Sequence, residues 1–207
     1  MSEKAYTLYG DRTSGNCYKP ALLLSLLGID YNWVEIPVLS GRTRQPPFLV
    51  KNPNGRVPLL EWADGRVLVE SNAILLHLAE GTPYLPGDAY LRALVYQWLF
   101  FEQYSHEPYV AVRRFLLQYD HGMEPDPARL AMLKDRGDQA LGVMDRVLAG
   151  QAFIAGEQYS IADIALFAYT HVADTGGFEL SNFPAVTRWL DRVREQPGHF
   201  DMFHFSP

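Results

Sequence analysis

Four short segments hold the residues whose types and spacing could carry chemistry. The first is Ser14-Gly15-Asn16-Cys17, which lies between a strand-like and a helical apolar segment. A helix start offers unpaired backbone N–H groups and the positive end of the helix dipole, and both stabilise an anion such as a thiolate. Ser14 and Asn16 would add side-chain donors at the same place. A simple helix cap by either side chain explains the same residue types.

Two further segments carry the donors and acceptors that a peptide-like ligand needs. In Arg56-Val57-Pro58 the X-Pro bond can be cis, which would leave the Val57 backbone free to pair with a ligand as an added strand. An ordinary trans proline at a strand start is the alternative. In Glu70-Ser71 the carboxylate would accept from an ammonium group, while Ser71 and the helix N–H groups would hold a carboxylate. Capping by Ser71 alone is the simpler interpretation.

The fourth segment, Ser160 to Asp163, has the spacing of a capping box and is followed by a run of apolar residues. The helix that begins here has too few polar residues to face solvent. Its first N–H groups therefore need partners from within the protein. We interpret Asp163 as a structural residue and not as a catalytic acid.

Composition excludes several classes of protein. A hydrophobic fraction of 48% is too high for a disordered chain. The single cysteine, Cys17, rules out an internal disulfide, and the six histidines lack metal-ligand spacing, so no metal is expected. A net charge of −6 without a basic cluster argues against nucleic acid as a partner. No long apolar run or signal-peptide pattern occurs, so we expect no membrane association and a cytoplasmic location.

The charge is nevertheless uneven along the chain. Residues 1–56 hold seven Lys or Arg and only four Asp or Glu, whereas the remainder is strongly acidic. A basic segment in an acidic protein can attract a small anion. Chance variation of the surface is an equally good explanation at this point.

The elements that must position these residues divide the chain into two parts. Hydrophobic periodicity predicts four strands and two main helices within residues 1–80, in the order βαβ and then ββα. That order predicts a four-stranded mixed sheet with a parallel first pair. Residues 81–88 break the periodicity and form the predicted linker. Residues 89–207 show only helical patterns, with a break expected at Pro108, and predict an all-helical domain.

Taken together, these segments resemble the cytosolic glutathione transferases, and bacterial members in particular, over nearly the whole chain. Arg56-Val57-Pro58 resembles the cis-proline turn of that family, Glu70-Ser71 its glutamate-serine pair, and Ser160 to Asp163 its C-terminal capping box. The resemblance implies a thioredoxin-like N-terminal domain and an all-helical C-terminal domain. It also implies a homodimer that uses glutathione and needs no metal.

The resemblance implies a role for each matched residue. The Val57 backbone would pair with the cysteinyl part of glutathione, and Glu70 with Ser71 would hold its γ-glutamyl end. Several cations could meet the glycine carboxylate: Arg56, with Arg42, Arg44 or Lys51. Glu102 or Gln103 of a partner subunit could reach the γ-glutamyl group.

The residue that activates the glutathione sulfur remains open among three. Ser14 resembles the serine of theta-like members, Asn16 the asparagine of the bacterial disulfide-reducing class, and Cys17 the cysteine of beta-class members. We expect Ser14 to be the donor with Asn16 assisting, and Cys17 to be as readily packed as reactive. The local pattern around Tyr6 and Tyr9 is not that of the tyrosine-type enzymes.

The implied activity is attack of the glutathione thiolate on a hydrophobic electrophile. Two alternatives stay open. One is a glutathione-dependent disulfide reductase or peroxidase, and the other is a protein that binds glutathione or a partner without catalysis.

Overall fold

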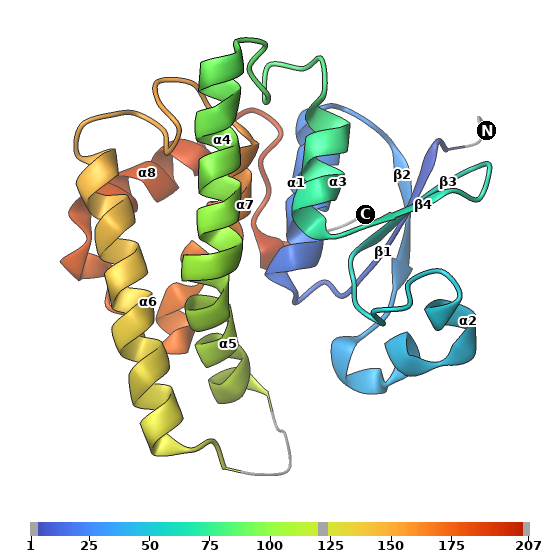
Figure 1. Ribbon diagram of the computed structural model, residues 1–207, viewed down its shortest axis with the longest axis horizontal. Coiled ribbons are helices and arrows are strands. Elements are labelled where there is room, and N and C mark those ends of the chain that lie inside the picture. The colour runs from blue at the N-terminus through green and yellow to red at the C-terminus, as the bar shows by residue number, and fades with distance from the viewer. Residues whose placement is uncertain (1–3, 120–123, 205–207) are drawn as a thin grey trace. The chain divides into compact units, whose positions relative to one another are not determined.

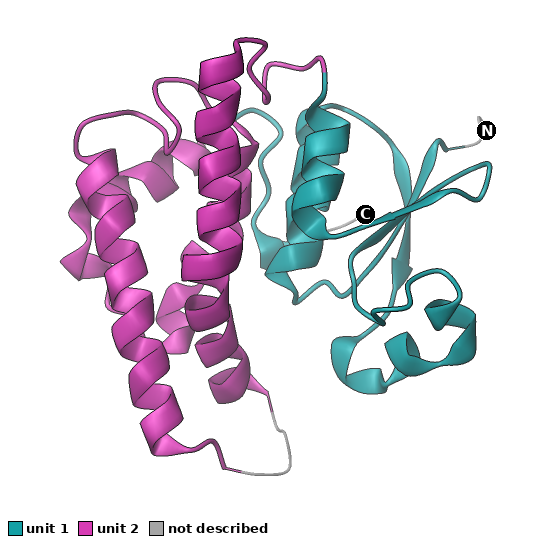
Figure 2. Ribbon diagram, viewed as in Figure 1, with its two compact units in different colours: residues 1–80, 196–207 teal, residues 81–195 magenta. Residues whose placement is uncertain are grey.

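The computed structural model describes residues 4–119 and 124–204. Contacts divide the chain into two compact units: residues up to Glu80 together with those from Gln196 on, and Gly81–Glu195 (Figure 2). The boundaries at residues 80 and 88 taken from the sequence stay a prediction. No sequence pattern indicated that the residues after Gln196 group with the first unit.

The first unit is built on a mixed sheet whose strand order is β2-β1-β3-β4. Strand β1 pairs parallel with β2 and antiparallel with β3, and β3 pairs antiparallel with β4. The predicted mixed sheet and its parallel first pair are thus confirmed. The strands are β1 (Tyr6–Gly10), β2 (Tyr31–Glu35), β3 (Leu59–Trp62) and β4 (Val67–Val69).

Two helices of this unit lie side by side against the sheet, α1 (Gly15–Leu26) and α3 (Ser71–Ala79) (Figure 1). Helix α1 is followed after its cap residue, Leu27, by a left-handed Gly28, whose φ of 64° favours glycine, as the sequence predicted. The short α2 (Pro46–Leu49) follows two single 3-10 turns in the long connection between β2 and β3.

The strand register gathers several connections at one end of the sheet. Tyr9 pairs with Leu59, and Leu59 pairs with Val69, so the end of β1, the start of β3 and the end of β4 are level. Gly10 also pairs with Glu35 at the end of β2. The chain that follows β1, β2 and β4, and the chain that precedes β3, therefore emerge at the same end.

The C-terminal segment of the first unit packs on α1 and forms hydrogen bonds with it. The Tyr18 hydroxyl donates to the Phe200 carbonyl at 2.6 Å, and their rings meet edge to face. The Ser25 hydroxyl donates to the Gly198 carbonyl at 2.9 Å. These long-range contacts explain why the segment groups with residues from which it is far in sequence.

The second unit is helical, as predicted. A π-helical turn, Glu102–His106, separates α4 from α5 and ends two residues before Pro108, which cannot donate a helical hydrogen bond. The kink or break predicted at Pro108 thus takes the form of a π-helical turn, and helix continues on both sides of it. The helices are α4 (Ala89–Phe101), α5 (Glu107–Gln118), α6 (Pro127–Leu148), α7 (Ile161–Thr170) and α8 (Pro184–Arg194).

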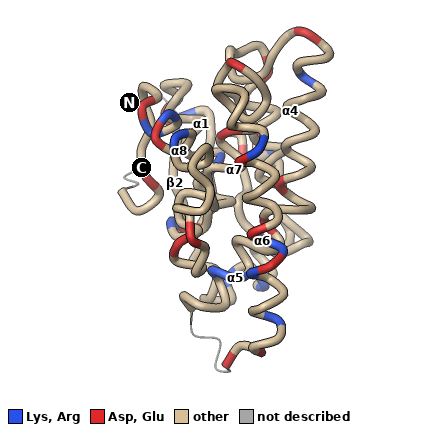
Figure 3. Tube along the Cα trace, turned by 90° about the vertical axis from the view of Figure 1, so that its left-hand side faces the viewer, with Lys and Arg blue, Asp and Glu red and all other residues tan. Residues whose placement is uncertain are grey.

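Two helices of this unit begin at the capping residues that the sequence contains. Asp126 caps α6 by accepting from Ala128 N at 3.0 Å, and residues of both charge signs follow along that helix (Figure 3). The capping box of Ser160 and Asp163 is present at the start of α7. Since Asp163 is fully buried and also accepts from Ile154 N and Trp189 Nε1, its role is structural, as expected.

No helix in the described part of the chain is long and apolar enough to cross a membrane.

Candidate functional site

Ser14, at the end of the loop from β1 to α1, and Asn16, in the first turn of α1, lie at the gathered end of the sheet. Ser14 is the N-cap residue of α1, but its side chain makes no capping hydrogen bond. Both side chains are half-buried. Capping by Ser14 therefore does not account for its residue type. Its side chain instead forms a hydrogen bond with the Cys17 sulfur, and the hydroxyl would have to turn from that sulfur to donate to an anion at the helix start.

A polar cluster around a buried lysine joins α1 to α3. Lys19 is fully buried, and its Nζ donates to Asn16 Oδ1 at 2.8 Å and to Ser71 Oγ at 3.4 Å. Ser71 Oγ in turn donates to Asn16 Oδ1 at 3.3 Å. Two residues that the sequence singled out separately are thus in contact. Lys19 was missed, although a lysine within an apolar helix was a signal for it.

Glu70 has an unusual backbone conformation directly before Ser71. Its φ of 70° makes it the single non-glycine residue with positive φ in the described ranges. Its side chain is exposed and makes no capping bond to α3. Strained backbone of this kind costs about 1–3 kcal/mol and is concentrated at ligand sites. The carboxylate is thereby presented at the gathered end of the sheet.

The turn before β3 contains a cis Val57-Pro58 bond, so the trans alternative is wrong. Val57 is half-buried and packs against a small apolar cluster that includes Phe48 and Leu59. Arg56 is exposed, and its carbonyl accepts from Asn52 Nδ2 at 2.7 Å. The Val57 backbone lies immediately outside the β3 ladder.

The remaining candidate cations differ in how they are engaged. Arg42 is exposed in a 3-10 turn after β2, and its guanidinium donates to the Glu35 carbonyl at 3.0 Å. Arg44 donates to the Asn54 carbonyl at 2.9 Å. Lys51 forms a close ion pair with Glu61. Arg42 and Arg56 are therefore better placed than Lys51 to meet a ligand carboxylate.

Gln103 belongs to the second unit, where it lies in the π-helical turn. Its Nε2 donates to Glu102 Oε2 at 2.8 Å, and Glu102 is fully buried. Its predicted role, contact from a partner subunit, stays a prediction.

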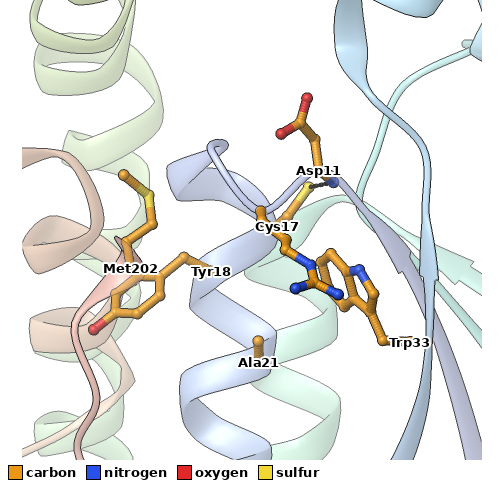
Figure 4. Close-up of a pocket in the computed structure, with 7 residues that line it drawn as sticks. Asp11, Cys17, Tyr18, Ala21, Trp33 and Met202 are labelled. Atoms are coloured by element: carbon orange, nitrogen blue, oxygen red, sulfur yellow. Dashed lines mark hydrogen bonds between the residues drawn. The ribbon is translucent and has the colours of Figure 1, made fainter. Parts of the chain in front are cut away.

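Cys17 is fully buried within α1. Its sulfur accepts from Asp11 N at 3.4 Å and, with Tyr18, Trp33 and Met202, lines a small pocket (Figure 4). Burial raises the pKa of the thiol to about 12, even though hydrogen bonds with Asp11 and Ser14 act in the opposite direction. Of the two roles considered for Cys17, this environment favours packing.

Tyr9 directs its hydroxyl to a neighbouring strand. It donates to Glu61 Oε2 at 2.5 Å, and burial together with this carboxylate raises the pKa of Tyr9 to about 12. Tyr6 packs edge to face on Trp62 at 5.6 Å. Because the Tyr9 proton is held by Glu61 and Tyr6 packs on the sheet, both tyrosines are poorly suited to activate a sulfur.

Within residues 4–119 and 124–204, no group of three or more His, Cys, Asp or Glu side chains could hold a metal ion.

Comparison with known proteins agrees with this geometry. The family model described as "Glutathione S-transferase, N-terminal domain" matches residues 8–84, and the one described as "Glutathione S-transferase, C-terminal domain" matches residues 100–197. A crystal structure of glutathione S-transferase from Pseudomonas fluorescens Pf-5 is 51% identical. It has a TM-score of 0.94 and covers 96% of this chain and 99% of that chain.

Two other relatives differ in their names. The Disulfide-bond oxidoreductase YfcG of Escherichia coli is 30% identical over 88% of this chain and 87% of its own length. A structure of Ure2p in complex with glutathione is 27% identical, with a TM-score of 0.84, over 96% of this chain and 92% of that chain. The chain spans 66% of the Saccharomyces cerevisiae transcriptional regulator URE2.

The two family models together match most of the chain, and the fold is the one that the resemblance implied. The chain belongs to the glutathione S-transferase family.

Proposed function

We propose that this protein is a glutathione transferase that binds glutathione at the gathered end of the sheet and activates its sulfur. The observation that carries the proposal is that three segments lie at this end of the sheet. They are Ser14–Asn16 at the start of α1, the cis Val57-Pro58 turn before β3, and Glu70-Ser71 after β4. Each was selected from the sequence by itself, and the hydrogen bond between Ser71 and Asn16 joins two of them.

Binding would use the charges of glutathione. The exposed Glu70 carboxylate accepts from the γ-glutamyl ammonium, and the first backbone N–H groups of α3, beginning at Ser71, hold the γ-glutamyl carboxylate. The Val57 backbone pairs with the cysteinyl backbone as an added strand would. Arg56 and Arg42 meet the glycine carboxylate. The basic character of residues 1–56 suits a tripeptide of net negative charge.

Activation lowers the pKa of the bound thiol. A free thiol with a pKa near 8.5 is only about 3% ionised at pH 7. Lowering that pKa by two units requires about 2.7 kcal/mol of preferential thiolate stabilisation. Hydrogen bonds from the Ser14 hydroxyl and the Asn16 amide, with the dipole of α1, are of that order. The thiolate then forms a C–S bond to an electrophilic carbon, and the leaving group departs with the bonding electrons.

Named relatives support this proposal. One similar structure is titled a glutathione S-transferase, and another is titled a complex with glutathione. The second substrate is proposed as a small hydrophobic electrophile.

We propose a homodimer in which Gln103 of one subunit reaches glutathione in the other. Sedimentation of the wild-type protein and glutathione titration of Gln103→Ala test this arrangement.

Reduction of disulfides is the second candidate, and the relative named Disulfide-bond oxidoreductase favours it. Here the thiolate of bound glutathione attacks one sulfur of a disulfide and the other sulfur leaves as a thiolate. A second glutathione then resolves the mixed disulfide and yields glutathione disulfide. Since the protein needs no cysteine of its own, the buried Cys17 is no obstacle.

Parallel turnover measurements separate the two candidates. The purified protein is assayed with glutathione and either a chloronitrobenzene or hydroxyethyl disulfide. Transferase activity predicts turnover of the first substrate, and activity on the disulfide alone would refute it. Ser14→Ala should raise the pKa of the bound thiol and leave glutathione affinity nearly unchanged. A wild-type protein without any glutathione-induced thermal shift would contradict both candidates.

A further inference from the structure

The side-chain amide of Asn16 has two chemically different ends, and its neighbours decide how it is turned. Asn16 Oδ1 accepts from Lys19 Nζ at 2.8 Å and from Ser71 Oγ at 3.3 Å. An ammonium group has three donors and no acceptor, so it can pair only with the oxygen end of an amide. The opposite orientation would set the Asn16 NH₂ group against the ammonium. Lys19 thus selects one of the two orientations.

Lys19 is held where it can do this. It is fully buried on α1, one helical turn after Asn16, and its Nζ also reaches Ser71 at the start of α3. Removing a lysine from water is costly, and an unbranched apolar side chain of similar length would fill the same space without that cost. Packing alone therefore does not explain a lysine at this position.

We propose that Lys19 is a positioning residue, a role that rests on the proposed function: it holds Asn16 Oδ1 so that the Nδ2 group serves as the donor to the glutathione sulfur. A bond from a cation to the amide oxygen also polarises the amide and strengthens its N–H groups as donors. Lys19 acts through Asn16 and does not itself touch the sulfur.

The test measures the pKa of the thiol of bound glutathione from its thiolate absorbance as pH is varied. Lys19→Met keeps the length of the side chain and removes the charge. We expect it to raise the pKa of the bound thiol by about one pH unit, the equivalent of one hydrogen bond to a charged group. Glutathione affinity at low pH, where the thiol is protonated, should change less than about threefold. Lys134→Met, which removes a lysine paired with Asp138 on α6, is the matched control and should leave the thiol pKa unchanged.

A double-mutant cycle asks whether Lys19 acts through Asn16. If it does, Lys19→Met should have little further effect on the thiol pKa once Asn16→Ala is present. An equal rise in both backgrounds would overturn the proposal, because Lys19 would then act on the sulfur directly or through the fold in general. An unchanged thiol pKa in Lys19→Met would overturn it as well.

Two further measurements keep the test decisive. If Lys19→Met does not fold, Asn16→Asp keeps an oxygen partner for Lys19 and removes the Nδ2 donor. That variant should fold and raise the pKa of the bound thiol by one pH unit or more, and a normal thiol pKa would refute the inference. Failure of the wild-type protein to bind glutathione would overturn the proposed function and this inference together. A wild type with a lowered thiol pKa that Lys19→Met does not change would overturn this inference alone.

Discussion

Replacing Cys17 by alanine separates a packed cysteine from a catalytic one. The side chain is fully buried in α1, and burial raises the pKa of its thiol to about 12. The thiolate fraction at pH 7 is then about 10⁻⁵, against about 3% for a free thiol with a pKa near 8.5. The ionised fraction of Cys17 is therefore about three thousandfold smaller than that of a free thiol. This ratio does not include the further slowing that results because the buried sulfur is hard to reach.

Two measurements follow from this magnitude. Native protein treated with iodoacetamide at pH 7 should be alkylated at Cys17 at least about a thousandfold more slowly than the same protein in denaturant, as followed by mass spectrometry. Cys17→Ala should keep its turnover within about twofold of wild type and lose about 1 kcal/mol of stability from the missing buried sulfur. The loss of stability in Cys17→Ala is measured as the change in the free energy of unfolding in urea.

Two results would show that Cys17 is catalytic and not packed. Rapid alkylation of native Cys17, with loss of activity that glutathione prevents, would mean that the sulfur is exposed and ionised in the working enzyme. Loss of turnover in Cys17→Ala with normal stability would carry the same meaning. Either would assign sulfur chemistry to Cys17 and remove the reason for assigning it to Ser14 and Asn16.

Three further predictions concern the side chains around the site and the core. Asp163→Ala should lower the free energy of unfolding by about 3–6 kcal/mol, because three buried N–H donors lose their acceptor. The same change at the half-buried Asp138, which pairs with Lys134, should cost under about 1 kcal/mol, and equal losses in urea would refute the argument. Burial alone would raise the pKa of Glu61, but hydrogen bonds from Lys51 and Tyr9 hold it below its ordinary value. Wild type should therefore exceed Glu61→Gln in stability above about pH 4.5, and this advantage should vanish as pH falls through the folded pKa. A difference that persists at low pH would contradict this sign. Glu70→Gly should stabilise the fold by about 1 kcal/mol by relieving its positive φ, while weakening glutathione binding about tenfold, as calorimetry would show. Unchanged binding would remove Glu70 from the site.

The hydrogen bond between the Ser71 hydroxyl and the Asn16 amide oxygen shows how the fold brings distant sequence positions together. Helices α1 and α3 pack against each other on the sheet, and this packing sets Lys19 between two residues that are 55 positions apart. The same sheet levels β1, β3 and β4, which brings the cis turn and Glu70 to the same end. A small rearrangement of the register would separate these groups.

Local sequence determined the elements and their order. Apolar periodicity, the Asp64-Gly65 hairpin, the glycine after α1, the Ser160–Asp163 box and the break before Pro108 each act within a few residues, through backbone geometry and capping. The order of strands then limited the sheet to a mixed topology. The residue types at the start of α1, before β3 and after β4 were sufficient to single out the segments of the candidate site.

Tertiary structure decided what each of those residues can do. Burial, which depends on neighbours far along the chain, makes Cys17 a packed thiol and joins the Tyr9 hydroxyl to Glu61. Strand register, and not proximity in sequence, brings Glu70 and Val57 to one end of the sheet. The apolar residues around Lys19 signalled that it is buried, but its role could not be predicted from them. Asn16 is one helical turn away on the same helix, whereas only the packing of α1 on α3 brings Ser71 to the Lys19 ammonium.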